Sequence, residues 1–144
     1  MRMCVQASFV VTKDSVLWSR NTDSHTAIIE EHGIHADGVR GPNIAKVEIP
    51  PPTGADGKPD YTAPLEQWRF SLDEDVTPEW CDVAEIERRT RAALPEWVAA
   101  KIVLPGETRN ELRDGQVVAC YGTIKSVRGS AVIKFVRGSA VIKS

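Results

Sequence analysis

The sequence contains two adjacent nonapeptides, SVRGSAVIK at residues 126–134 and FVRGSAVIK at residues 135–143, which are identical at eight of nine positions. A repeat at a fixed short period indicates stacked equivalent units, each too small to bury its own apolar face. Each unit joins a β-forming run to an Arg-Gly-Ser corner, where glycine supplies a permissive backbone. We therefore expect a short C-terminal β-repeat, either a solenoid or an antiparallel meander.

Of these two geometries the solenoid is favoured, because parallel coiling most simply places Ile124, Ile133 and Ile142 in one stacked row. The lysines form a second row: Lys125, Lys134 and Lys143. Such lysines protect a sheet edge from aggregation. Because the last repeat presents an open edge, we expect a homo-oligomer, most simply a dimer, joined through the repeat.

The charge distribution is uneven, although the formal net charge is only −2. Residues 115–144 carry five basic side chains and no acidic one, so the remaining 114 residues sum to −7. Seven carboxylates and no base lie between Asp73 and Glu87. Such an asymmetric field steers a partner or joins two parts of one protein. The acidic body repels phosphate, so nucleic acid is not an expected partner.

Upstream of the repeat, the pattern predicts an α+β domain over residues 1–105, with residues 106–144 forming a linker and the β-repeat tail. Apolar residues alternate over 5–11, 45–49 and 68–72, which indicates strands of a mixed or antiparallel sheet. Residues 16–18 are expected to form a second strand that pairs with the first as a hairpin. The segment 50–64 holds five of the nine prolines and is expected to be an irregular loop.

Two or three helices are expected to pack on this sheet. The first spans residues 24–32, with Asp23 or Ser24 as its N-cap and Gly33 as a left-handed residue after its end. The second runs from Asp82 to residue 94. A third, short helix follows from Pro95, because proline ends or kinks a helix.

Composition limits the class of protein. Hydrophobic residues make up 42% and charged residues 26%, which is typical of a globular chain. The sequence has no apolar run of roughly 18 residues and no leader pattern, so we expect neither a membrane span nor a signal peptide. Three scattered cysteines, Cys4, Cys81 and Cys120, do not make a disulfide framework. A cytoplasmic location is therefore expected.

All three histidines fall within eleven residues: His25, His32 and His35. His25 and His32 share one face of the expected helix and, with His35 and one carboxylate, would complete a tetrahedral zinc set. Because this spacing matches no established zinc motif, we favour a structural role and expect no cofactor. In an enzyme, His25 would act as a general base oriented by Asp23 or Glu48. No nucleophile motif accompanies it.

Several side chains are candidates for holding an anion. Arg40 and Asn43 lie in a glycine-rich turn, GVRGPN at residues 38–43, whose backbone donors suit a phosphate. In the tail, Arg128, Lys134 and Arg137 offer further cationic contacts. The alternative interpretation is an ordinary loop and a solvated basic face.

The tail resembles tandem repeats of the type SxVxGSAxI at the ends of small uncharacterised proteins of phages and actinobacteria. The likeness extends to TDSH at 22–25, KVE at 46–48 and TPEW at 77–80, whereas Cys81 replaces the usual aromatic residue. The resemblance implies a phage or prophage origin. It also implies a non-catalytic binding protein that sequesters a host protein or a small anionic, nucleotide-like ligand, as a counter-defence or host-takeover factor. The alternative function is a small metal-assisted or general-base hydrolase built on the histidines.

Overall fold

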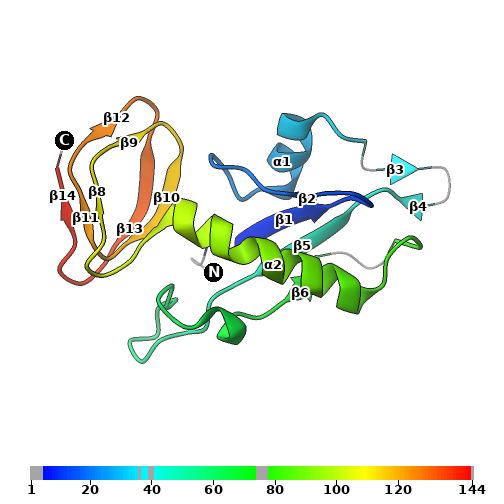
Figure 1. The fold of residues 1–144 in the computed structure, drawn as a ribbon, viewed down its shortest axis with the longest axis horizontal. Helices are drawn as coiled ribbons and strands as arrows, with labels where there is room; N and C mark the ends of the chain where they lie inside the picture. The colour runs from blue at the N-terminus through cyan, green and yellow to red at the C-terminus, as the bar shows by residue number, and fades with distance from the viewer. Residues whose placement is uncertain (1–4, 36, 39–40, 74–77, 144) are drawn as a thin grey trace. The chain divides into compact units, whose positions relative to one another are not determined.

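The computed structural model describes residues 5–35, 37–38, 41–73 and 78–143 (Figure 1). This part of the chain has mixed α and β content, with two α-helices, an antiparallel sheet and a set of parallel strands. The chain divides into two compact units, Met1–Ser19 with Asp23–Pro95 and Arg20–Thr22 with Glu96–Ser144. None of the described helices is long and apolar enough to cross a membrane.

The first unit contains a four-stranded antiparallel sheet in the order β2–β1–β5–β6. Its strands are β1 (Ala7–Val11), β2 (Val16–Leu17), β5 (Ala45–Ile49) and β6 (Ser71–Leu72). The expected hairpin is present, since Val10 pairs with Leu17 across a turn closed by Thr12. A separate antiparallel pair joins β3 (Asp37–Gly38) to β4 (Gly41–Pro42).

Helix α1 (His25–His32) has the predicted ends. Its N-cap is Ser24, whose Oγ accepts a hydrogen bond from Ala27 N at 3.3 Å, and Gly33 follows with φ 62°. Ile28 of α1 forms a buried cluster with Val10 and Ile44. Strand β1 is consequently buried along its whole length, and not half-buried as its alternation predicts, because α1 covers its second face.

Two elements differ from the sequence prediction. The strand expected over 68–72 is reduced to β6, because Trp68 instead ends the short 3₁₀ helix η1 (Leu65–Gln67) and donates from Nε1 to Ala63 O at 3.2 Å. Helix α2 (Val83–Lys101) continues through Pro95 as one helix. Burial of Leu94 and Trp97 on either side of the proline outweighs the missing backbone donor.

The second unit consists of short parallel strands in three stacks, β7–β10–β13, β8–β11–β14 and β9–β12. The first stack holds β7 (Ile102–Val103), β10 (Gln116–Cys120) and β13 (Val132–Val136). The second holds β8 (Thr108–Arg109), β11 (Thr123–Ile124) and β14 (Val141–Ile142). The third holds β9 (Leu112–Arg113) and β12 (Val127–Arg128).

The register of these stacks corrects one expectation. Ile142 does pair with Ile124, but Ile133 pairs with Val117 in another stack, so the three isoleucines do not form one row. The reason is that the chain returns to a stack after 15–18 residues, as between Thr123 and Val141, and not after nine. All these pairings are parallel, whereas a meander would be antiparallel.

Candidate functional site

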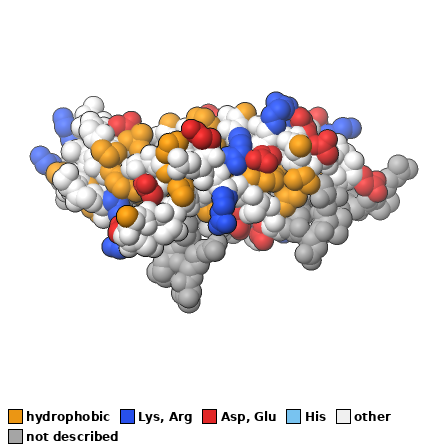
Figure 2. All heavy atoms as spheres, turned by 90° about the horizontal axis from the view of Figure 1, so that it is seen from below, with side chains coloured by type: hydrophobic (Ala, Val, Ile, Leu, Met, Phe, Trp, Pro, Cys, Tyr) orange, Lys and Arg blue, Asp and Glu red, His pale blue; other side chains and the backbone are white. Residues whose placement is uncertain are grey.

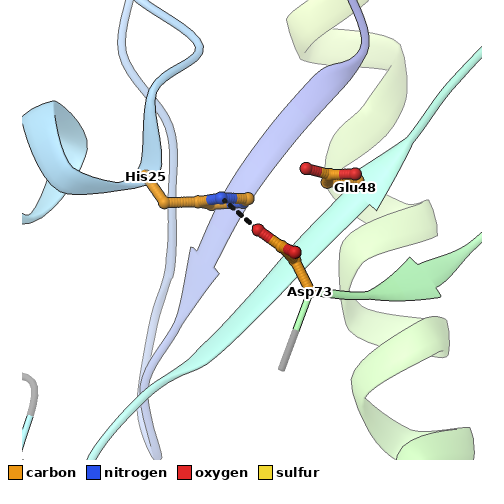
Figure 3. A group of neighbouring side chains, drawn as sticks. All are labelled: His25, Glu48 and Asp73. Atoms are coloured by element: carbon orange, nitrogen blue, oxygen red, sulfur yellow. Dashed lines mark ion pairs between the residues drawn. The ribbon is translucent and has the colours of Figure 1, made fainter. Parts of the chain in front are cut away.

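Three side chains of the first unit converge from three separate elements: His25 at the start of α1, Glu48 in β5 and Asp73 just after β6 (Figure 3). Each offers one nitrogen or carboxylate oxygen atom, and these atoms all lie within 4.8 Å of one another. We call these three residues the His25 cluster.

The sheet register explains why the cluster forms. Glu48 is two residues from Lys46, which pairs with Val10, so all three point to the face of the sheet that α1 covers. Asp73 extends the β6 ladder, because its backbone N donates to Lys46 O at 2.8 Å, and it therefore reaches the same face. In Figure 3 the ribbon of α2 lies behind the sheet, on the side away from these side chains.

The His25 ring is held at both nitrogens. Its Nε2 lies 2.9 Å from Val47 O, and its Nδ1 lies 3.5 Å from Asp73 Oδ2. A carbonyl oxygen only accepts, so Nε2 carries a hydrogen. Nδ1 then faces the carboxylate with a second hydrogen when the ring is protonated and with its lone pair when the ring is neutral. The His25 side chain is 10% exposed and that of Asp73 is 55% exposed, so solvent reaches the cluster from the Asp73 side.

Ser8 is another polar residue on this face. Its Cα is the ladder partner of Glu48, so the two side chains project to the same side of the sheet. Ser8 is completely buried, and its Oγ has no hydrogen-bond partner within the described part of the chain. Most buried hydroxyl groups in proteins are hydrogen-bonded, so that of Ser8 is unusual.

Of the residues considered for catalysis, the structure brings His25 and Glu48 together. The other two histidines lie outside this cluster. His32 Nε2 instead lies 3.2 Å from Trp18 O and 3.5 Å from Glu31 Oε2. His35 is exposed, and its backbone oxygen accepts from Asn43 Nδ2 at 3.2 Å. Asp23 precedes the N-cap of α1 and does not belong to the His25 cluster.

The residues expected to bind an anion each have different contacts. Arg40 lies outside the described residues, and Asn43 makes the bond to His35 O. The Nε atom of Arg128 lies 3.2 Å from Glu111 Oε1, and the guanidinium of Arg137 lies 4.9 Å from the ring centre of Phe135. The remaining one, Lys134, is exposed on β13.

The second unit contains a cavity of about 310 Å³ lined by several basic residues. Lys101 is fully buried there and donates from Nζ to Thr22 O and to Gln116 Oε1, both at 3.2 Å. Arg109 donates to Ala100 O at 2.8 Å near the end of α2, and burial lowers the pKa of its guanidinium. Because these cations already bind carbonyl oxygens of the chain, the cavity is a weak candidate for an anion site.

Asp73 is the functional candidate that sequence reasoning missed. It opens the acidic run that ends at Glu87, where it is one carboxylate among seven. Nothing in local spacing links it to His25 or Glu48, because only the pairing of β5 with β6 brings it to them.

Comparison of the chain with protein-family models, with curated proteins and with solved structures finds no match.

Proposed function

We propose that the protein binds a divalent metal ion through Nδ1 of His25 and the carboxylates of Glu48 and Asp73. The observation that carries the proposal is the convergence of these three ligand atoms within 4.8 Å. Imidazole nitrogen and carboxylate oxygen are both ligands that zinc accepts, imidazole suits iron, and carboxylates suit manganese.

The hydrogen bond of His25 supports this assignment. Metal-binding histidines usually donate their other ring N–H to a carbonyl or carboxylate, which holds the ring and its tautomer. Here the contact between Nε2 and Val47 O fills that role and leaves Nδ1 facing Asp73. A lone pair that faces a carboxylate is favourable only when a cation, either a proton or a metal ion, lies between them.

The binding test is isothermal titration of the full chain with Mn²⁺, Zn²⁺ or Co²⁺. We expect one ion per chain, and we expect Glu48→Gln and Asp73→Asn each to weaken binding by roughly 10–100-fold or more. His32→Ala and Glu30→Gln are matched controls on α1, outside the cluster, and should bind as the wild type does. Equal losses in the controls, or unchanged binding in Asp73→Asn, would contradict the proposal.

Hydrolysis is the second candidate function, because three protein ligands leave coordination positions for a water molecule and a substrate. The exposure of Asp73 gives a substrate access to these positions. The measurement is turnover of activated esters and phosphate esters with and without the metal ion that titrates the cluster. Turnover that survives both chelation and Glu48→Gln would contradict this candidate.

We also propose that the second unit is a short β-solenoid, in which the chain passes in turn through the three stacks. Parallel pairing in each stack and a shared buried cluster, which includes Val103, Val117 and Ile124, support this geometry. The phage origin, the host-takeover role, the sequestered nucleotide-like ligand and the cytoplasmic location stay predictions from the sequence.

A further inference from the structure

We propose that strand β13, which β14 follows in the chain, offers a docking edge for an extended acidic segment of a partner protein, which adds to the stack of β13 as a further strand. The proposal concerns the second unit and is independent of the His25 cluster. It joins three observations: exposed apolar side chains, unpaired strand edges and charge of a single sign.

Apolar exposure is concentrated on these two strands. The described part of the chain exposes five large hydrophobic side chains, and four of them lie on β13 and β14: Val132, Val136, Val141 and Ile142, which are 36–57% exposed. Along β13, burial alternates, because Ile133 packs against the buried cluster around Val117 while Val132 and Val136 face solvent. Exposed apolar side chains that lie together mark interaction surfaces.

The strand edges offer backbone hydrogen bonds to a partner. Strand β13 pairs with β10 on one side, and β14 pairs with β11, but neither has a second strand neighbour within the described residues. A strand with one open edge is a template for an added extended peptide. The open edge of β13 therefore supplies affinity that does not depend on particular side chains.

The positive charge on and beside these strands indicates which kind of partner would bind. Lys134 lies between Val132 and Val136, Lys143 follows β14, and no carboxylate occurs anywhere in residues 115–144. Figure 2 shows Lys and Arg side chains on the surface of this unit, on the left of the view. Two copies whose β13 strands paired antiparallel and centred on Lys134 would set lysine against lysine, which destabilises a strand pair. An acidic strand with alternating apolar residues complements the edge.

The experiment uses fluorescence anisotropy with a labelled synthetic peptide of alternating valine and glutamate, titrated with the full chain. We expect binding that weakens with salt and protection of β13 amides from hydrogen exchange. Lys134→Glu should weaken binding at least roughly tenfold, and Lys134→Gln should lie between this variant and the wild type. Lys58→Glu, the same charge reversal at an exposed lysine of the first unit, should bind like the wild type.

Four outcomes would overturn the proposal. In the first, polyglutamate, heparin or duplex DNA binds as tightly as the alternating peptide, which would make the tail a general polyanion binder. In the second, a peptide with lysine in place of glutamate binds equally well. In the third, Lys134→Glu has no effect although circular dichroism shows that it is folded. In the fourth, the chain alone is a stable dimer in which β13 amides are already protected from exchange, so that a second copy occupies the edge.

Discussion

Asp114 illustrates how one residue holds a corner between two strands. It adopts a left-handed backbone conformation with φ 57°, which is uncommon for a residue other than glycine. Its Oδ1 accepts hydrogen bonds from Ser130 N at 2.8 Å and from Ser130 Oγ at 3.0 Å. These two bonds, the backbone one first, lower the pKa of the Asp114 carboxyl. A side chain at Gly129 would overlap the same carboxylate.

The lowered pKa predicts a pH dependence at this corner. The folded pKa lies below the ordinary aspartate value of about 3.9, so ionised Asp114 stabilises the fold above that pH. The stabilisation is lost as the pH falls through the folded pKa. We expect the stability difference between the wild type and Asp114→Asn, measured by urea unfolding, to shrink on acidification.

The control for this experiment is Asp14→Asn, which removes an exposed carboxylate in the turn of the β1–β2 hairpin. A wild-type advantage over Asp114→Asn that stays constant from neutral pH to well below the ordinary aspartate pKa would contradict the prediction.

At the same scale, sequence reasoning reached part of the candidate site. His25 and Glu48 could be chosen because both are ionisable side chains in elements that the pattern predicts correctly. Asp73 could not be chosen, because its role depends on the pairing of Glu48 with Ser71, a contact between distant parts of the chain. His32 and His35 were grouped with His25 on spacing alone, yet His32 turns to Trp18 O instead.

Among the elements, helix α1 and strand β5 were predictable because caps and alternation act locally. Helix α2 was predicted as two pieces because proline is unfavourable inside a helix. Its continuity depends on the burial of Leu94 and Trp97, which are 1% and 0% exposed. The prediction of a strand over residues 68–72 was wrong for a similar reason. Burial of Trp68 beside Tyr61 stabilises another backbone conformation there in spite of the alternating pattern.

The corner between β10 and β11 gives a prediction at this scale. A Cβ on Gly122 would lie 2.6 Å from Leu104 O and closer still to Glu107 O. Both oxygens belong to the backbone between β7 and β8, so neither moves without disturbing the stack. We expect Gly122→Ala to lower the free energy of unfolding by about 3 kcal/mol or more, the upper end of the cost of overpacking, measured by chemical denaturation.

Gly138→Ala is the comparison variant. Gly138 has φ 55° but no atom within 4 Å of its would-be Cβ, so alanine there costs only backbone strain, of about 1–2 kcal/mol. If the two variants were equally stable, crowding at Gly122 would not be the cause of the stability lost in Gly122→Ala.

At the scale of the whole molecule, the stacking register can be tested with engineered disulfides. Thr123 pairs with Val141, whereas nine-residue spacing would set Thr123 beside Val132. In a background without the three natural cysteines, Thr123→Cys with Val141→Cys should oxidise readily, because paired parallel residues have the Cα separation that a disulfide needs.

The pair Thr123→Cys with Val132→Cys is the matched control and should stay reduced under the same mild oxidant. Thiol titration and the mobility of the unfolded chain on a gel report each result. Faster oxidation of the control pair would show that the chain stacks at nine residues and that the register of the three stacks is wrong.

The difference between the length of the repeat and the spacing of the stacks has a consequence for how such a tail can evolve. Ile124 and Ile142 are partners eighteen residues apart, so two nonapeptides bring the chain back to the same stack, whereas one nonapeptide brings Ile133 to another stack. Insertion of one further nonapeptide by unequal recombination would move the following isoleucine to the other stack, whereas insertion of two would return it to the same stack. Whether the number of inserted copies is odd or even, and not their total length alone, would decide which stack the later strands join.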